Sequence, residues 1–170
     1  MSKGLVHLYH GEGKGKTTAA MGLAVRALGQ GKRVVVLQFL KDGTSGELQS
    51  LERLGAEVFS GLPGTRLAFR MTEEEKTESA RWSKEMLRHV LGIPCDMLIL
   101  DELCAARRYN MVSEVEAKRA VLDRPDTCEV IITGRDPEKW MIDAADYITE
   151  MKCVRHPFQK GIAARRGIEF

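Results

Sequence analysis

A glycine-rich segment near the N-terminus, GEGKGKTT at residues 11–18, restricts the possible folds of this chain more than any other feature. An apolar run, Leu5–Tyr9, precedes it and predicts a buried strand. From Thr17 to Leu28, apolar residues recur at helical spacing. A strand, a glycine-rich turn and a helix in this order are typical of a loop that binds the phosphates of a nucleotide. We predict such a loop here, with a chance glycine-rich turn as the alternative.

The chemistry of the loop residues supports this prediction. Glycines let backbone N–H groups turn toward phosphate oxygens, and the start of the helix adds the positive end of its dipole. Lys16 supplies a positive charge, Lys14 adds a second one, and the hydroxyl of Thr17 is a ligand for Mg²⁺. The usual pattern, G-x-x-x-x-G-K-[ST], has a glycine where this chain has His10, and we expect Gly11 to make that turn instead.

Two adjacent carboxylates end an apolar strand in the segment CDMLILDEL, residues 95–103. In a phosphate-loop protein, a carboxylate at such a position meets the Mg²⁺ held by the loop threonine, and its neighbour can orient a water or make a second metal contact. We therefore predict Thr17, Asp101 and Glu102 as metal ligands and Glu102 as a catalytic candidate. The alternative is a strand that simply ends in solvated acidic residues.

A third apolar strand ends in VIITGRD, residues 130–136, and its carboxyl end is expected to face the same crevice. Arg135 can stabilise charge that develops on a departing phosphate group, which makes it a catalytic candidate together with Lys16. A simple salt bridge is the alternative role. Lys41, after VVVLQFL, has the same two interpretations, and His156, in a loop before Pro157, is a further candidate.

Short apolar runs alternate with helical patterns along the chain. This alternation predicts a three-layer α/β fold with a mainly parallel sheet, in a single nucleotide-binding domain that spans residues 1–170. The ligand is expected at the carboxyl ends of the strands. The expected strands are Leu5–Tyr9, Arg33–Phe39, Glu57–Phe59, Met97–Leu100, Val130–Thr133 and Tyr147–Met151.

Capping signals mark the ends of several expected helices. The first helix is expected to bury Met21, Val25 and Leu28 and to end at Gly29 in the left-handed conformation. A short helix is expected to end at Gly55. The expected N-terminal capping residues are Ser45, Thr72 with Glu75, Ser113 with Glu116, and Asp136 before Pro137.

The composition argues against several classes of protein. The 26 basic and 24 acidic residues give a net charge of +2, which provides no electrostatic argument for a nucleic-acid or membrane partner. Four cysteines without a C-x-x-C pair indicate reduced thiols rather than a zinc site or a disulfide framework. No apolar run is long enough for a signal peptide or a membrane span, so the expected location is the cytoplasm.

The order and spacing of several segments resemble the ATP:corrinoid adenosyltransferase (cob(I)alamin adenosyltransferase) family, whose members have a RecA-like P-loop fold. In that family the phosphate loop typically reads G-x-G-K-G-K-T-T without the first glycine, so His10 is ordinary there. The resemblance covers nearly the whole chain. The segments that carry it are GEGKGKTTAAMGLAVRALGQGKRV, VVVLQFLK, GELQSLERLGAEV, MLILDEL, EVIITGR and RHPFQKGIAARRGIEF.

This resemblance implies transfer of the 5′-deoxyadenosyl group of ATP to the Co(I) centre of a reduced corrinoid, with triphosphate leaving and an adenosylcorrinoid such as adenosylcobalamin forming. It implies Mg²⁺ with ATP as co-substrate, held by Thr17 with Asp101 or Glu102. A reductase that donates electrons to cobalt and a homodimer are also implied. The residues implied to hold the phosphates are Gly11, Gly13, Lys14, Gly15, Lys16, Thr17 and Thr18.

Two departures from the family concern the corrinoid. Many members have an N-terminal extension that helps to cover the corrinoid, whereas this sequence begins almost at the first strand, so closure over the corrinoid is expected to differ. Many also have an aromatic pair with a tryptophan after the third strand, where the loop at residues 60–72 offers only Phe69. Phe69 is a candidate corrinoid contact, with packing in the core as the alternative.

Two other reactions use the same loop chemistry. A small-molecule kinase would yield ADP and a phosphorylated acceptor, and a P-loop ATPase would use Glu102 to align water and yield ADP and phosphate. The products of ATP therefore discriminate among the three hypotheses.

Overall fold

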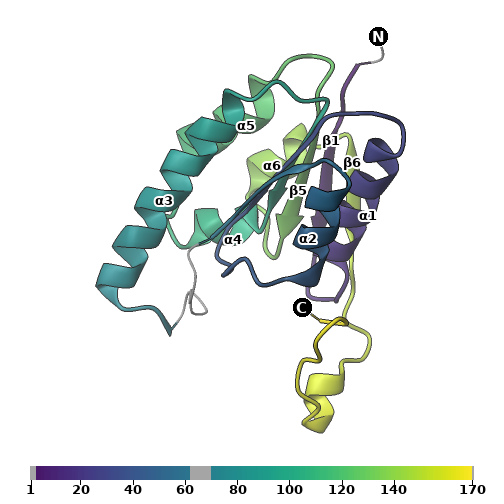
Figure 1. The fold of residues 1–170 in the computed structure, drawn as a ribbon. Coiled ribbons are helices and arrows are strands. Elements are labelled where there is room, and N and C mark those ends of the chain that lie inside the picture. The colour runs from purple at the N-terminus through teal and green to yellow at the C-terminus, as the bar shows by residue number, and fades with distance from the viewer. Residues whose placement is uncertain (1–2, 62–69, 170) are drawn as a thin grey trace.

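The computed structural model describes residues 3–61 and 70–169 and shows one sheet between two layers of helices (Figure 1). Within these residues, no helix is long and apolar enough to span a membrane. The elements, in chain order, are β1 (Val6–His10), α1 (Lys16–Leu28), β2 (Val34–Gln38), α2 (Gly46–Arg53), β3 (Glu57–Ser60), α3 (Glu73–Leu91), β4 (Met97–Asp101), α4 (Leu103–Arg108), α5 (Glu114–Leu122), β5 (Glu129–Gly134), α6 (Lys139–Ala144), β6 (Tyr147–Glu150) and a 3₁₀ helix (Pro157–Lys160).

The sheet has six strands in the order β3-β2-β4-β5-β1-β6, and every neighbouring pair is parallel. This confirms the predicted α/β class and a topology consistent with a P-loop fold. All five residues of β2 and all five of β4 are buried, which explains why these strands read as continuous apolar runs. Because all the strands are parallel, their carboxyl ends lie at one edge of the sheet.

Alternating side chains of the strands build a core on each face of the sheet. On one face, Val36 and Ile99 pack with the α1 and α2 residues of their core cluster. On the other face, Leu37 and Leu100 share a cluster with residues of α3, α4, α5 and α6. Each fully buried aliphatic side chain of this kind contributes about 1.5–3 kcal/mol through removal of apolar surface from water.

The first helix differs from its prediction in two ways. The side chains that it buries against the sheet are mainly small alanines, such as Ala20 and Ala24, and Val25 is 47% exposed. Small residues let the helix lie close to the sheet, so a larger apolar residue one step round the helix is left outside this contact. Gly29 has a right-handed φ of −62°, and the left-handed turn is made by Gly31 at φ 71°.

The capping predictions have mixed outcomes. Both capping boxes, Thr72 with Glu75 and Ser113 with Glu116, form with both hydrogen bonds in place. Ser45 occupies the N-cap position of α2, without a side-chain capping bond, and Gly55 follows that helix at φ 97°.

The prediction of a cap at Asp136 before Pro137 is wrong. Asp136 has φ 48°, α6 begins two residues after the proline, and Glu138 is its N-cap residue. The positive φ of Asp136 does not fit the extended conformation of an N-cap residue, which Glu138 adopts instead, with its carboxylate held by Arg107 on α4.

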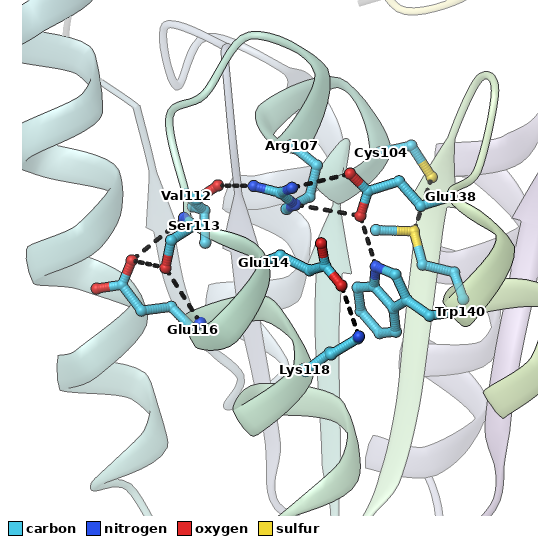
Figure 2. Close-up of polar contacts among 10 residues, drawn as sticks. Cys104, Arg107, Val112, Ser113, Glu114, Glu116, Lys118, Glu138 and Trp140 are labelled. Atoms are coloured by element: carbon cyan, nitrogen blue, oxygen red, sulfur yellow. Dashed lines mark hydrogen bonds and ion pairs between the residues drawn. The ribbon is translucent and has the colours of Figure 1, made fainter.

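A cluster of polar contacts joins α4, α5 and the start of α6 (Figure 2). The guanidinium of Arg107 donates to both carboxylate oxygens of Glu138, at 2.9 Å and 3.2 Å, and to the carbonyl of Val112. The indole N–H of Trp140 donates to the same carboxylate. Because α4 follows Glu102 and α6 follows Arg135, the Arg107–Glu138 pair connects two segments that adjoin the predicted site.

Replacement of Arg107 by methionine is expected to lower the free energy of unfolding by about 2–3 kcal/mol, because it removes the cation from the half-buried carboxylate of Glu138, which keeps the Trp140 indole as a donor, and leaves the carbonyl of Val112 without the Arg107 donor. Urea denaturation followed by circular dichroism measures this loss. The exposed pair Lys139–Asp143 on α6 provides the control, since K139M should change stability by less than about 0.5 kcal/mol. Equal effects of the two variants would contradict a structural role for Arg107.

Candidate nucleotide-binding site

The glycine-rich loop lies between β1 and α1, at the carboxyl edge of the sheet, as predicted. It lines a cleft of about 840 Å³ together with the adjoining parts of α1 and α2, Glu102, Arg135 and the C-terminal segment. Figure 1 shows this segment, in yellow, running beyond the ends of α1 and α2. The cleft brings together residues 12–18, the two predicted polar strand ends and a tail wall formed by His156 and residues 167–169.

Two glycines give the loop its backbone conformation. Gly11 has φ 107° and Gly15, at the N-cap of α1, has φ 117°, so both lie in a region that residues with side chains rarely adopt. Gly11 therefore makes the turn that the usual pattern assigns to the position of His10, as predicted. Gly13 is needed for a different reason, since a Cβ atom there would lie 2.6 Å from the carbonyl oxygen of Met151.

The C-terminal end of β6 supports this loop from behind. The carbonyl of Met151 accepts a hydrogen bond from the N–H of Gly13 at 2.6 Å, and the N–H of Met151 donates to the carbonyl of His10 at 2.8 Å. A Cβ atom at Gly11 would also lie 2.6 Å from the Met151 carbonyl oxygen. The chain around residue 151 thus packs against the loop so closely that only glycine fits.

The G11A variant is expected to lower the free energy of unfolding by about 2 kcal/mol and to raise KM for the nucleotide, since alanine meets both the positive φ and the Met151 carbonyl. Denaturant titration and initial-rate kinetics measure the two effects. G29A is the matched control, because Gly29 has a right-handed φ and its nearest atom to an added Cβ is 3.4 Å away. A G11A protein with unchanged stability and KM would contradict the described loop conformation.

Lys16 is the first residue of α1 and is buried, with only 8% of its surface exposed. Its ammonium donates to two loop carbonyls, those of Gly11 at 2.7 Å and Gly13 at 2.8 Å. Burial lowers the pKa of Lys16, while the nearby Glu102 acts in the opposite direction. A buried ammonium held inside the loop is positioned to serve an anionic ligand without first losing a full shell of water.

Asp101, the last residue of β4, is fully buried and accepts four hydrogen bonds. Its Oδ1 atom accepts from Thr17 at 2.9 Å and Thr133 at 2.6 Å, and its Oδ2 atom accepts from Gln38 at 2.9 Å and Lys41 at 3.1 Å. The predicted pair of Thr17 and Asp101 is therefore in direct contact. Lys41 forms a salt bridge with Asp101, which is one of the two roles considered for it.

Glu102 follows in a left-handed backbone conformation with φ 62°. Its N–H donates to the hydroxyl of Thr133 at 2.9 Å, so this hydroxyl links the two acidic residues. Burial raises the pKa of Glu102, and the adjacent Asp101 carboxylate adds to the rise. The side chain lines the cleft beside the loop, but no hydrogen bond joins it to Thr17 among the contacts of the described residues.

The remaining cations at the cleft have protein partners. Arg135 forms an exposed salt bridge with Glu12 of the loop at 3.1 Å. Lys14 donates to the carbonyl of Ile168 in the tail at 2.9 Å. His156, which also lines the cleft, accepts a hydrogen bond at Nδ1 from the N–H of Phe158 at 3.2 Å.

Sequence reasoning missed Gln38 and the extent of the tail wall. Gln38 is a fully buried amide at the end of β2, and its side-chain carbonyl accepts from Ser60 at 2.9 Å. The signal for Gln38 was present, since it is the single polar residue in the run VVVLQFL. The candidate corrinoid contact Phe69 and most of the 60–72 loop lie outside the described residues.

The glycine-rich loop holds a buried lysine, and its threonine is bonded to a buried aspartate at the end of β4, a parallel strand of the same sheet. These features define the chain as a P-loop nucleotide-binding protein. The chain belongs to the family of ATP:corrinoid adenosyltransferases BtuR/CobO/CobP, whose family model matches residues 2–170. The chain is accordingly a corrinoid adenosyltransferase, as the sequence resemblance implied.

Curated relatives agree with this assignment. A corrinoid adenosyltransferase of Escherichia coli is 35% identical over 170 residues, covering 99% of this chain and 86% of the relative. The corrinoid adenosyltransferase CobA of Salmonella typhimurium is 38% identical over 173 residues, with coverage of 99% and 86%. A corrinoid adenosyltransferase of Pseudomonas aeruginosa is 33% identical over 173 residues, with coverage of 99% and 84%.

Proposed function

We propose that this adenosyltransferase moves the 5′-deoxyadenosyl group of ATP to the Co(I) centre of a reduced corrinoid and releases triphosphate. The observation that supports the proposal is the buried Thr17–Asp101 pair beside the glycine-rich loop, in a cleft of about 840 Å³. In this reaction an electron pair of Co(I) forms the bond to C5′ of the ribose. The bond from C5′ to oxygen breaks, and its electron pair leaves with triphosphate.

The chain does not need to supply a nucleophile for this step, because the reduced cobalt is one. Its tasks are to hold the two substrates in line and to balance the charge on the leaving triphosphate. Lys16 is the principal candidate for the second task, with Lys14 and Arg135 at the mouth of the cleft. The backbone N–H groups of Gly15 and neighbouring loop residues, and the hydroxyl of Thr18, complete the proposed set of phosphate contacts, while the N–H of Gly13 is bonded to the Met151 carbonyl.

Mg²⁺ fits the donor set at the loop. A threonine hydroxyl and a buried carboxylate, 2.9 Å apart, are the hard oxygen donors that this ion prefers. We assign Thr17 and Asp101 as the residues that would hold it, with Glu102 as a further candidate on the same edge. The ion would supply positive charge to the triphosphate oxygens. The ammonium of Lys41 donates to the hydroxyl of Thr17 and to the carboxylate of Asp101, so its positive charge compensates the buried carboxylate.

The remaining parts of the proposal concern the setting of the reaction. An electron-donating reductase for the cobalt and a homodimer follow from the family resemblance, whereas the proposed cytoplasmic location follows from the lack of a long apolar run in the sequence. The composition gives no argument for a nucleic-acid or membrane partner. Which corrinoid is the natural substrate depends on contacts in the 60–72 loop, where Phe69 is the candidate contact residue.

The test is an anaerobic assay with chemically reduced cobalamin, Mg-ATP and the protein. We expect the spectrum of light-sensitive adenosylcobalamin to grow in step with triphosphate, at one triphosphate per corrinoid. Omission of Mg²⁺ should reduce the rate. Release of ADP with an unchanged corrinoid spectrum would overturn the proposed reaction in favour of an ATPase or a kinase.

A further inference from the structure

A second cavity, of about 440 Å³, lies at the edge of the sheet opposite to the nucleotide cleft. Its walls are formed by the C-terminal ends of α3 and α5 and by the short segments that precede β2, β4 and β5. None of the residues that line it contributes to the nucleotide cleft. The adenosyl transfer therefore gives no role to this cavity.

Two cysteines meet in the wall of this cavity. Cys95 lies just before β4 and Cys128 just before β5, and their Sγ atoms are 3.8 Å apart although 33 positions separate them in the chain. This proximity follows from the parallel pairing of β4 with β5, which places the two strand starts side by side. Cys128 is buried, whereas Cys95 is partly exposed and gives the pair contact with solvent through the cavity.

The backbone around the two thiols is held by specific bonds. The side chain of Arg124 donates to the carbonyl of Cys128 at 2.9 Å and also to the carbonyls of Val121 and Gly4. On the other strand, the carbonyl of Asp96 accepts from the N–H of Glu129 at 3.0 Å. These contacts keep the two strand starts together, and with them the two thiols.

The surroundings of the two sulfurs are not equivalent. The hydrogen bond from Cys95 and the positive charge of Arg124 lower the pKa of Cys128, although burial and Asp96 oppose this. The same contact with Cys128, together with burial, raises the pKa of Cys95. A thiolate at Cys128 therefore has a thiol beside it as a resolving partner.

We propose that Cys95 and Cys128 form a reactive dithiol that is oxidised reversibly to an intramolecular disulfide by small peroxides. The Cys128 thiolate attacks one peroxide oxygen, the O–O bond breaks, and hydroxide leaves to give a sulfenic acid. The sulfur of Cys95 then attacks the Cys128 sulfur and expels the hydroxyl group, which leaves as water with the proton of the Cys95 thiol. Two thiols and one hydrogen peroxide thus yield one disulfide and two waters.

The contact distance supports this step. A disulfide has sulfurs about 2.05 Å apart, and the present separation of 3.8 Å is that of two sulfurs in contact. The other two cysteines provide contrasts within the same chain. Cys104 is buried beside Met141, and burial raises its pKa to about 12, while Cys153 is exposed in the tail without a neighbouring thiol in the part of the chain that the structure describes.

The experiment treats the full-length reduced protein with hydrogen peroxide, removes the oxidant with catalase, and labels the remaining thiols with N-ethylmaleimide under denaturing conditions. A C153S background prevents reaction at the exposed cysteine. Before labelling, we expect a mass loss of about 2 Da. After labelling, we expect the maleimide on Cys104 but not on Cys95 or Cys128, a proteolytic fragment that links Cys95 to Cys128, and full recovery of both thiols with dithiothreitol. Non-reducing electrophoresis should show only the monomer.

Each other outcome has a definite meaning. Failure to form the Cys95–Cys128 fragment, while the exposed Cys153 of the unsubstituted chain is oxidised under the same conditions, would overturn the proposal. Oxygen addition at Cys128 without a link to Cys95 would overturn it as well. In C95S, the proposal expects peroxide to leave a sulfenic acid at Cys128, which dimedone traps. Peptide mapping of the unsubstituted chain decides the question even where a cysteine variant folds poorly.

Discussion

Replacement of Lys16 by alanine is expected to lower kcat/KM for adenosyl transfer by about 100- to 1000-fold, the usual cost of removing one strong donor from a developing negative charge. Lys16 is the buried ammonium of the glycine-rich loop, and its present partners are two backbone carbonyls. In the reaction it would face the triphosphate. The loss should therefore appear in the rate of adenosylcobalamin formation at saturating corrinoid, measured anaerobically.

The same substitution should leave the chain folded. Because the folded-state pKa of Lys16 is lowered, the protonated side chain costs the folded state free energy at every pH below the pKa of an unfolded lysine. This cost falls as the pH rises above the folded-state pKa and is gone above the pKa of an unfolded lysine. Truncation removes the cost together with the two hydrogen bonds, so we expect the free energy of unfolding at neutral pH to change by less than about 1.5 kcal/mol.

An exposed lysine on α3 provides the matched control for K16A. K76A removes an equivalent charge far from the loop, from a surface pair with Glu73, and should keep full activity. Full activity of a folded K16A protein would show that the glycine-rich loop does not bind the leaving phosphates. Unfolding of K16A would instead show that the chain needs the bonds from Lys16 to the loop carbonyls in order to fold.

D101N is the second substitution with a large expected effect. Both carboxylate oxygens of Asp101 accept hydrogen bonds in the structure. In asparagine, an NH₂ group replaces one of these oxygens and faces donors instead of acceptors. The substitution also leaves the Lys41 ammonium without its carboxylate. We expect a loss of about 2–4 kcal/mol in the free energy of unfolding and a fall in activity of about 100-fold or more.

A double variant separates the structural part of this effect from the catalytic part. In D101N/K41M the uncompensated ammonium is gone, so stability should recover in part while activity stays low. D143N, on the exposed surface of α6, is the control and should change neither quantity. Full recovery of activity in the double variant would contradict the assignment of Asp101 to the nucleotide site.

The local features of this protein could largely be predicted from its sequence. Every strand was expected within about one residue of its observed bounds. The signal is strongest for β2 and β4, which are buried on both faces and read as unbroken apolar runs. The loop, the Asp101 strand end and the two capping boxes likewise depend on short-range chemistry. The contact of Thr17 with Asp101 could also be predicted, because the carboxyl ends of parallel strands lie at one edge of the sheet.

The features that could not be predicted depend on contacts between distant segments. Nothing near Met151 indicates that its carbonyl packs against Gly11 and Gly13. The distance in sequence between Cys95 and Cys128 similarly hides their contact. The wrong prediction for Asp136 also involves a distant contact, since Glu138, the observed N-cap residue of α6, is bonded to Arg107 on α4.

The support of the glycine-rich loop by residue 151 has a consequence for synthesis of the chain. The loop is made first, and the segment around Met151 that supports it is made about 140 residues later. At translation rates of about 5–20 residues per second, this interval lasts roughly 7–28 s. A nascent chain should therefore acquire full affinity for nucleotide only after residue 151 has been made, so β2, β3, β4 and β5 are synthesised before ATP can assist their folding.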